Sequence, residues 1–170
     1  MRVSGPSRWG ATVIGTVGSD EKAELAKDHG CDHTILYRHE NFVERVREIT
    51  NGSMVPVVYD SVGKDTFSAS LDCLAPRGLM VLFGQSSGAV EPINLGILAQ
   101  KGSLYVTRPT LQTYADQRAD LLAMSQDLFN VVLSGAVKIE INQTYPLRDA
   151  AKAHQDLQAR KTTGSTILTV

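Results

Sequence analysis

Short apolar runs alternate along the chain with amphipathic segments of helical spacing. The apolar runs predict strands at 11–17, 34–37, 55–62, 79–83 and 104–107. The segments between and after them predict helices at 20–29, 42–49, 65–74, 95–100 and 115–133. This alternation is typical of a parallel sheet with crossover helices, so we expect an α/β fold.

Local signals place several ends of these elements. Asn41 precedes an apolar pattern of period 3.6 and is expected to cap the helix at 42–49. Pro76 and Gly78 are expected to stop the helix at 65–74. The continuous apolar run at 55–62 predicts a strand that is buried on both faces.

The alternation of strand and helix patterns changes after Gly135. An alternating stretch at 139–141 is followed by "YPL", which should break the chain, then by a helical segment at 149–158 and a strand at 165–170. These elements have no obvious place in a compact α/β domain. We therefore expect residues 9–135 to form one domain and residues 136–170 to form a tail that packs on another domain.

The stretch "ATVIGTVGSDEK" runs from a strand through glycine into a helix N-terminus, as phosphate-binding loops do. It lacks G-x-G-x-x-G, because Gly15 and Gly18 have no third glycine at the required spacing. Ser19 stands where an NAD-binding protein has an acid for the ribose hydroxyls, and Lys22 follows one turn later. This combination favours a 2′-phosphate, although the two acidic residues between them count against it.

Two other motifs have competing interpretations. "HGCDH" at 29–33 contains metal-binding residue types, but a helix end, a turn and a strand start would scatter them, so no metal site is expected. "GQSSG" at 84–88 matches the G-x-S-x-G motif of serine hydrolases, with Ser86 as nucleophile. Pro92 delays the helix that such an elbow needs, so a ligand-binding loop at a strand end is the better interpretation.

Charge, apolar run length and cysteine content argue against several classes of function. The formal net charge is −1 and no basic run is present, which argues against nucleic-acid and membrane-surface binding. No apolar run reaches the ~18 residues of a membrane span, and the start of the chain has no signal-peptide core. Two cysteines are too few for a disulfide framework, so a reducing, cytoplasmic location is expected. Residues 1–8 are polar and are expected to be a lead peptide or an expression remnant.

Several long stretches together resemble a known family. They are "GATVIGTVGSDEK", "ILYRHENFVERVREITNG", "VVYDSVGKDTFSASLDCLAPRGLMVLFGQSSGAV", "LGILAQKGSLYVTRPTL" and "YPLRDAAKAH". They resemble the cofactor-binding part of NADPH-dependent quinone oxidoreductases, the zinc-free medium-chain reductases related to zeta-crystallin. In that family the glycine-rich turn follows the first strand, and "ATVIGTV" resembles the second. The resemblance therefore implies a Rossmann-like, doubly wound parallel sheet that lacks its first strand and that turn.

The resemblance also implies site residues and chemistry. Around the adenosine and its 2′-phosphate it places Gly15, Ser19, Lys22, Tyr37 and Arg160. Along the cleft and the nicotinamide half it places Ser61, Phe83, Gly84, Ser86, Ser87, Val106 and Thr107. Family members transfer a hydride from NADPH to a quinone or enone. No side chain is identified as catalytic.

Two further expectations concern assembly and rival functions. The edge strand near 104–107 is apolar and β-prone, so a homodimer through that strand is expected, as the resemblance also suggests. Because the first strand and the catalytic domain of the family are missing, the chain alone is expected to be inactive. A non-catalytic nucleotide-binding or structural module and the Ser86 hydrolase are the alternatives.

Overall fold

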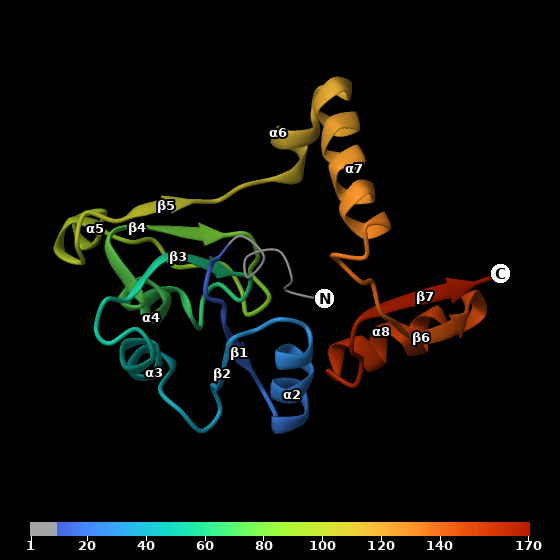
Figure 1. Cartoon of the computed structure of the whole chain (residues 1–170), viewed down its shortest axis with the longest axis horizontal. Coiled ribbons are helices and arrows are strands. Elements are labelled where there is room, and N and C mark those ends of the chain that lie inside the picture. The colour runs from blue at the N-terminus through green and yellow to red at the C-terminus, as the bar shows by residue number, and fades with distance from the viewer. Residues whose placement is uncertain (1–9) are drawn as a thin grey trace. The chain divides into compact units, whose positions relative to one another are not determined.

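The computed structural model describes residues 10–170, so the lead peptide expected at 1–8 lies outside the described residues. The strands are β1 (Ile14–Val17), β2 (His33–Leu36), β3 (Val55–Asp60), β4 (Leu74–Leu82), β5 (Tyr105–Thr107), β6 (Ile141–Pro146) and β7 (Ser165–Thr169). The helices are α2 (Asp20–Asp28), α3 (Phe42–Ile49), α4 (Phe67–Asp72), α5 (Gly96–Gln100), α6 (Leu111–Ala115), α7 (Arg118–Leu133) and α8 (Ala150–Gln158), with a 3₁₀ turn at Leu147–Asp149 (Figure 1).

The chain divides into two compact units. The central unit contains Thr16–Asp20 and Ile35–Met124. The terminal unit contains the chain up to Gly15, Glu21–Thr34 and Ser125–Val170.

The strand pairing confirms the expected fold class. β4 lies between β3 and β5 and runs parallel to both, while β1 pairs with β2 in a separate sheet. In a Rossmann order of 3-2-1-4-5-6, β1 and β2 correspond to strands 2 and 3, and β3, β4 and β5 correspond to strands 4, 5 and 6. Within residues 10–170 the pairing is therefore that of strands 2 to 6 of a Rossmann-like sheet.

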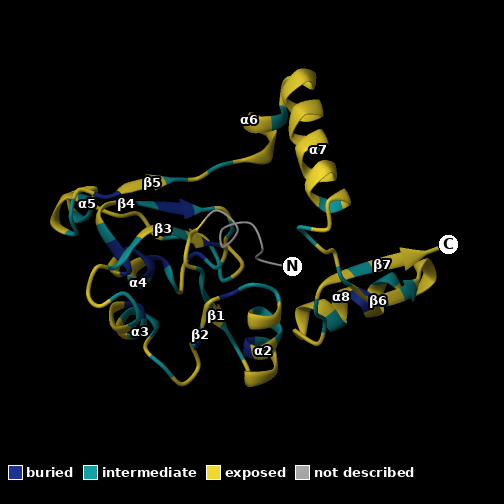
Figure 2. Ribbon diagram, in the orientation of Figure 1, coloured by how far each residue is buried: buried dark blue, intermediate teal, exposed yellow. Residues whose placement is uncertain are grey.

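The core of the central unit lies between α4 and the sheet. Phe67 and Leu71, one helical turn apart, pack with Leu74, Met80 and Leu104. Figure 2 shows buried segments in α4 and β4, and Figure 1 shows α3 and α4 on the same side of the three strands. This packing fixes the ends of β3 and β4, from which the candidate site is built.

The prediction that β3 is buried on both faces is wrong. Val58 packs against the core, but Val57 is 38% exposed and Tyr59 is 73% exposed. Side chains alternate across a strand, and α4 covers only one face of this sheet in the described part of the unit. An apolar run alone does not reveal that the second face is left uncovered.

The predicted stop at Pro76 and Gly78 is also wrong in position. α4 already ends at Asp72, and β4 runs through both residues. The ladder jumps there from Val55–Leu74 to Val57–Leu79, so β4 carries an irregular insertion. A bulge accommodates residues that a regular strand excludes.

Two other local predictions, a helix cap and a long helix, agree better with the structure. The Asn41 side chain accepts hydrogen bonds from the amides of Val43 at 3.0 Å and Glu44 at 3.5 Å, which confirms the helix cap. The helix expected at 115–133 is present as α7, which begins at Arg118 and ends at Leu133, and the short helix α6 precedes it. Along α7 the side chains are mostly exposed (Figure 2), including Leu128 and Phe129.

The end of the chain forms a strand–helix–strand motif in the terminal unit. β6 and β7 are parallel and α8 connects them. The Tyr145 hydroxyl donates to Asp156 of α8 at 3.0 Å, which ties strand to helix. The strand continues through "YP" to Pro146, so the expected chain break comes later than predicted. Packing of this motif on another domain stays a prediction.

Candidate functional site

Two loops follow the carboxyl ends of β3 and β4 and lie against each other in the central unit. These paired loops are residues 61–66 and 83–88. The amide of Ser86 donates to the carbonyl of Ser61 at 3.1 Å, and the amide of Ser87 donates to that of Val62 at 2.8 Å. The sequence placed Ser86 and Ser87 after a strand end and Ser61 inside the strand expected at 55–62, and the structure brings these residues together beyond the ends of β3 and β4.

The Ser87 side chain strengthens this pairing. Its hydroxyl donates to the Val62 carbonyl at 2.8 Å and accepts from the Asp65 amide at 3.1 Å. The Lys64 amide donates to the Gly88 carbonyl at 3.1 Å. Since both backbone and side-chain bonds cross between the loops, the two loops form one structural unit.

Glycine is required where the loops approach most closely. A Cβ atom at Gly84 would lie 2.5 Å from the Ser61 carbonyl oxygen. Gly63 has a φ of +90°, and a Cβ there would lie 2.7 Å from the Gly88 carbonyl oxygen. Neither position has room for a side chain, so these glycines allow the backbone contact.

Asp60, the last residue of β3, anchors the first loop and was not identified from the sequence. It is 5% exposed. Its carboxylate accepts from the Val62 amide at 2.7 Å, the Gly63 amide at 3.1 Å, the Thr66 hydroxyl at 2.7 Å and the Ser70 hydroxyl at 2.8 Å. Burial alone would raise the pKa of Asp60, but these four donors outweigh burial and lower it. Its signal in the sequence was an acid at a strand end, followed closely by Gly, Thr and Ser.

An aromatic pair and an edge strand adjoin the paired loops. Phe83 is 52% exposed and meets Tyr59 edge to face, with ring centroids 6.5 Å apart. Thr107 pairs with Val81, two residues before Phe83, and Val106 pairs with Met80. Phe83, Gly84, Val106 and Thr107 are thus all in or next to the ladder of β4 and β5.

Two residues that the resemblance assigns to the adenosine side, Ser19 and Tyr37, lie at the same turn of the central unit. The Tyr37 amide donates to the Val17 carbonyl at 3.2 Å. A Cβ atom on Gly18 would lie 3.0 Å from the Tyr37 hydroxyl oxygen, so this hydroxyl lies over the turn that leads through Ser19 into α2. Tyr37 remains 42% exposed. The turn therefore combines two hydroxyl side chains with the start of a helix, which suits an anion.

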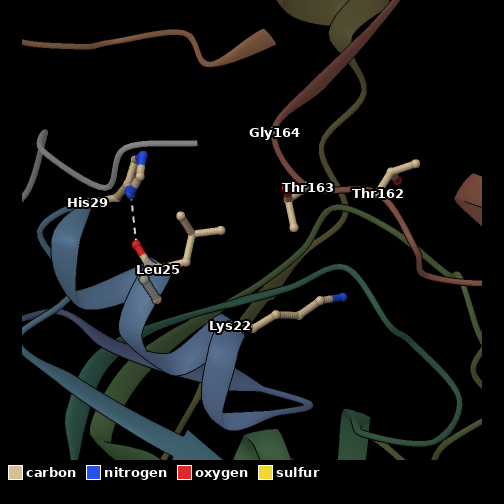
Figure 3. Close-up of a pocket in the computed structure, with 7 residues that line it drawn as sticks. Lys22, Leu25, His29, Thr162, Thr163 and Gly164 are labelled. Atoms are coloured by element: carbon tan, nitrogen blue, oxygen red, sulfur yellow. Dashed lines mark hydrogen bonds between the residues drawn. The ribbon is translucent and has the colours of Figure 1, made fainter. Parts of the chain in front are cut away.

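In the terminal unit, Lys22 and Arg160 are neighbours. The Lys22 ammonium donates to the Arg160 carbonyl oxygen at 3.4 Å. Lys22 also lines a pocket of about 260 Å³ between α2 and the segment before β7, lined by Lys22, Leu25, Ala26, His29, Thr162, Thr163 and Gly164. Figure 3 shows Lys22, Leu25 and His29 on the side of α2 that faces Thr162 and Thr163. Lys22 and Arg160 were identified separately from the sequence, and the structure places them next to each other in the terminal unit.

Gly15 and the "HGCDH" segment pack together. A Cβ atom on Gly15 would lie 2.9 Å from the Cys31 sulfur, so packing alone accounts for this glycine. The Cys31 thiol is buried and donates to the His33 carbonyl at 2.9 Å, and burial raises its pKa. His29 bonds to the Leu25 carbonyl through Nδ1 at 2.7 Å. Within residues 10–170 no group of three His, Cys, Asp or Glu side chains is arranged to hold a metal ion.

The nucleophile elbow at "GQSSG" lacks its expected context. After the loop no helix begins until Gly96, whereas an elbow needs a helix at once. The Ser86 and Ser87 amides are instead used in the pairing with residues 61–62. The segment is a loop held against its neighbour, which supports a ligand-binding role over a hydrolase.

None of the helices described at 10–170 is long and apolar enough to cross a bilayer.

Comparison with known proteins gives a consistent set of matches. A family model described as zinc-binding dehydrogenase matches residues 3–125. A quinone oxidoreductase of Pseudomonas aeruginosa is 60% identical over 94% of this chain and 49% of its own length. A 2-haloacrylate reductase of a Burkholderia species is 49% identical over 94% of this chain and 48% of its own length.

Among solved structures, the Escherichia coli quinone oxidoreductase complexed with NADPH superimposes with a TM-score of 0.94 at 53% identity. The match covers 98% of this chain and 52% of that one. The chain spans about half the length of the curated relatives it matches.

Proposed function

The chain belongs to the zinc-binding dehydrogenase family, and we propose that it is the cofactor-binding portion of an NADPH:quinone oxidoreductase. In the complete enzyme a hydride passes from NADPH to a quinone or enone. The observation that carries the proposal is the likeness over 98% of the chain to a quinone oxidoreductase complexed with NADPH. The similarity to a 2-haloacrylate reductase supports an activated alkene as a second class of acceptor.

The described residues fit one half of such a cofactor in the central unit. Gly84 allows the backbones of the paired loops to meet, so their hydroxyl groups and amides gather at the carboxyl ends of β3 and β4. Ligands of open α/β sheets bind at this edge. We assign to the nicotinamide half Ser61, Phe83, Gly84, Ser86, Ser87, Val106 and Thr107.

The residues of the adenosine half are carried over from the family resemblance. In the central unit these are Ser19 and Tyr37, and in the terminal unit they are Gly15, Lys22 and Arg160. A lysine near a helix start favours an added phosphate charge, which supports NADPH over NADH. Bound NADPH supplies the hydride, and the side chains bind and orient it. No residue is assigned a catalytic role.

Three further properties belong to the same proposal. The parent enzyme works without zinc, in line with the resemblance to zeta-crystallin-like reductases. It is a cytoplasmic protein, because two buried cysteines indicate no disulfide framework. It is a homodimer joined at β5, which is the outer strand of the described three-stranded sheet and exposes Tyr105.

Calorimetric titration of the purified 170-residue chain with NADPH and NADH tests the proposal. We expect NADPH to bind more tightly than NADH and the chain alone to show little turnover with a quinone, because turnover needs cofactor and acceptor held together. Absence of NADPH binding at millimolar concentration would contradict cofactor binding. Turnover near that of an intact quinone oxidoreductase would contradict the expected inactivity, and labelling of Ser86 by a serine-reactive phosphonate would favour the hydrolase.

A further inference from the structure

We propose that Asp60 is a positioning residue for the cofactor: its carboxylate holds loop 61–66, and through it loop 83–88, in the form that receives the nicotinamide half. This inference rests on the proposed function. Asp60 itself is 5% exposed and lies beneath the loop surface, so it acts through the residues around it.

A chain of hydrogen bonds connects Asp60 to the two loops of the candidate site. One carboxylate oxygen accepts from the amides of Val62 and Gly63. That bond set fixes the backbone of the first loop, whose Ser61 and Val62 carbonyls accept from the amides of Ser86 and Ser87. The position of the second loop therefore depends on the shape that Asp60 gives to the first.

The other carboxylate oxygen ties the same loop to the core. It accepts from the hydroxyls of Thr66 and Ser70 at 2.7 and 2.8 Å. Ser70 lies in α4 and is itself buried, next to core residue Leu71. Asp60 thus joins three parts of the central unit: the end of β3, loop 61–66 and α4.

The geometry also explains why a carboxylate suits this position. Four donors converge on two oxygens, and an ionised carboxylate accepts at both of them. Asparagine can still accept from the two amides, and its NH₂ group can donate to the two hydroxyls after they rotate. Alanine removes all four acceptor sites and leaves the amides and hydroxyls without this partner. Asn should therefore largely rescue the loop, and Ala should not.

The test compares Asp60→Ala, Asp60→Asn and the control Asp72→Asn. Asp72 is the last residue of α4, the helix that Asp60 contacts through Ser70, but it is an exposed carboxylate paired with Lys101. Ligands are NADPH and adenosine 2′,5′-bisphosphate, which lacks the nicotinamide half. We expect Asp60→Ala to weaken NADPH roughly tenfold, Asp60→Asn to weaken it much less, and neither to change the affinity of the bisphosphate. The control should change neither affinity.

Amide hydrogen exchange gives a second readout that needs no ligand. Asp60→Ala should speed exchange at Val62, Gly63, Ser86 and Ser87 while the amides of β4 stay protected. Unchanged exchange at the four loop amides, or equal weakening of both ligands, would overturn the positioning role. If the wild type binds no NADPH, the proposed function fails. Hydrogen exchange then still tests whether Asp60 holds loops 61–66 and 83–88 in place. Should Asp60→Ala not fold, Thr66→Val and Ser70→Ala remove single donors and must show the same pattern more weakly.

Discussion

Gly84 lies so close to Ser61 that a Cβ atom at position 84 would be 2.5 Å from the Ser61 carbonyl oxygen. This contact joins the ends of two neighbouring parallel strands. It also requires that residue 84 has no side chain, because the atom in the way belongs to the backbone. Glycine here is needed for close approach and not for an unusual φ angle.

Gly84→Ala should therefore destabilise the central unit. Forcing a methyl group into a packed site typically costs about 1–3 kcal/mol, and we expect a loss of unfolding free energy in that range. Urea denaturation measures it. Gly96→Ala is the control, because its Cβ would meet only the Asn94 side chain, at 3.1 Å, which is able to move. Equal effects at both positions would contradict the close contact.

Lys22→Ala should weaken NADPH and leave NADH nearly unchanged. A hydrogen bond to a charged group contributes roughly 1.5–3 kcal/mol, and only NADPH carries the 2′-phosphate. Calorimetric titration with both cofactors measures the difference. Lys27→Ala is a matched control on the same helix, since Lys27 is paired with Glu24 at 2.8 Å. Equal losses for both cofactors would refute the assignment of Lys22.

The stability of the chain should depend on pH through Asp60. Its pKa is lowered in the folded state, mainly because four donors outweigh burial, so the folded form binds a proton less readily than the unfolded form. The stabilisation is present above the unfolded pKa of about 3.9 and is lost as pH falls through the folded pKa. The stability advantage of the wild type over Asp60→Asn should therefore shrink in acid. Urea denaturation at several pH values measures this, and an advantage that is constant or grows toward low pH would be contrary to it.

The proposed dimer can be tested at β5. Val106→Pro removes a backbone donor from an outer strand and should shift the wild-type dimer toward monomer in sedimentation experiments. Tyr105→Lys is a milder second variant, because Tyr105 is 61% exposed and a charge there discourages strand pairing. Circular dichroism checks that both variants fold. A wild-type monomer at high micromolar concentration would end the proposal, and a folded variant that stays dimeric would place the interface elsewhere.

The features predicted correctly from the sequence depend on neighbouring residues. The Asn41 cap is one example, since its acceptor and its two donors lie within three positions. The end of β4 was recognisable because the apolar run at 79–83 stops at glycine and a small hydroxyl-rich loop. That was enough to bring Ser86 under consideration, whereas Ser61 came from the family resemblance, because its contact with Ser86 spans a long stretch of chain.

The features that were missed depend on packing. The uncovered side of β3 at Tyr59 could not be read from its apolar run, because that run is the same whether one face or both are covered. The bulge at Pro76 exists because β4 pairs with β3 on both sides of it. Asp60 lay within the strand predicted at 55–62, and its role becomes visible only in the structure, where Thr66 and Ser70 donate their hydroxyls to it.

An NMR titration of the isotopically labelled 170-residue chain with NADPH tests most directly whether the paired loops hold the cofactor. We expect the amide signals of Ser61, Gly84, Ser86 and Ser87 to shift with NADPH, while those of β6 and β7 stay in place. NADPH at millimolar concentration that leaves the paired-loop signals unmoved, or that moves only those of β6 and β7, would contradict the proposed cofactor site.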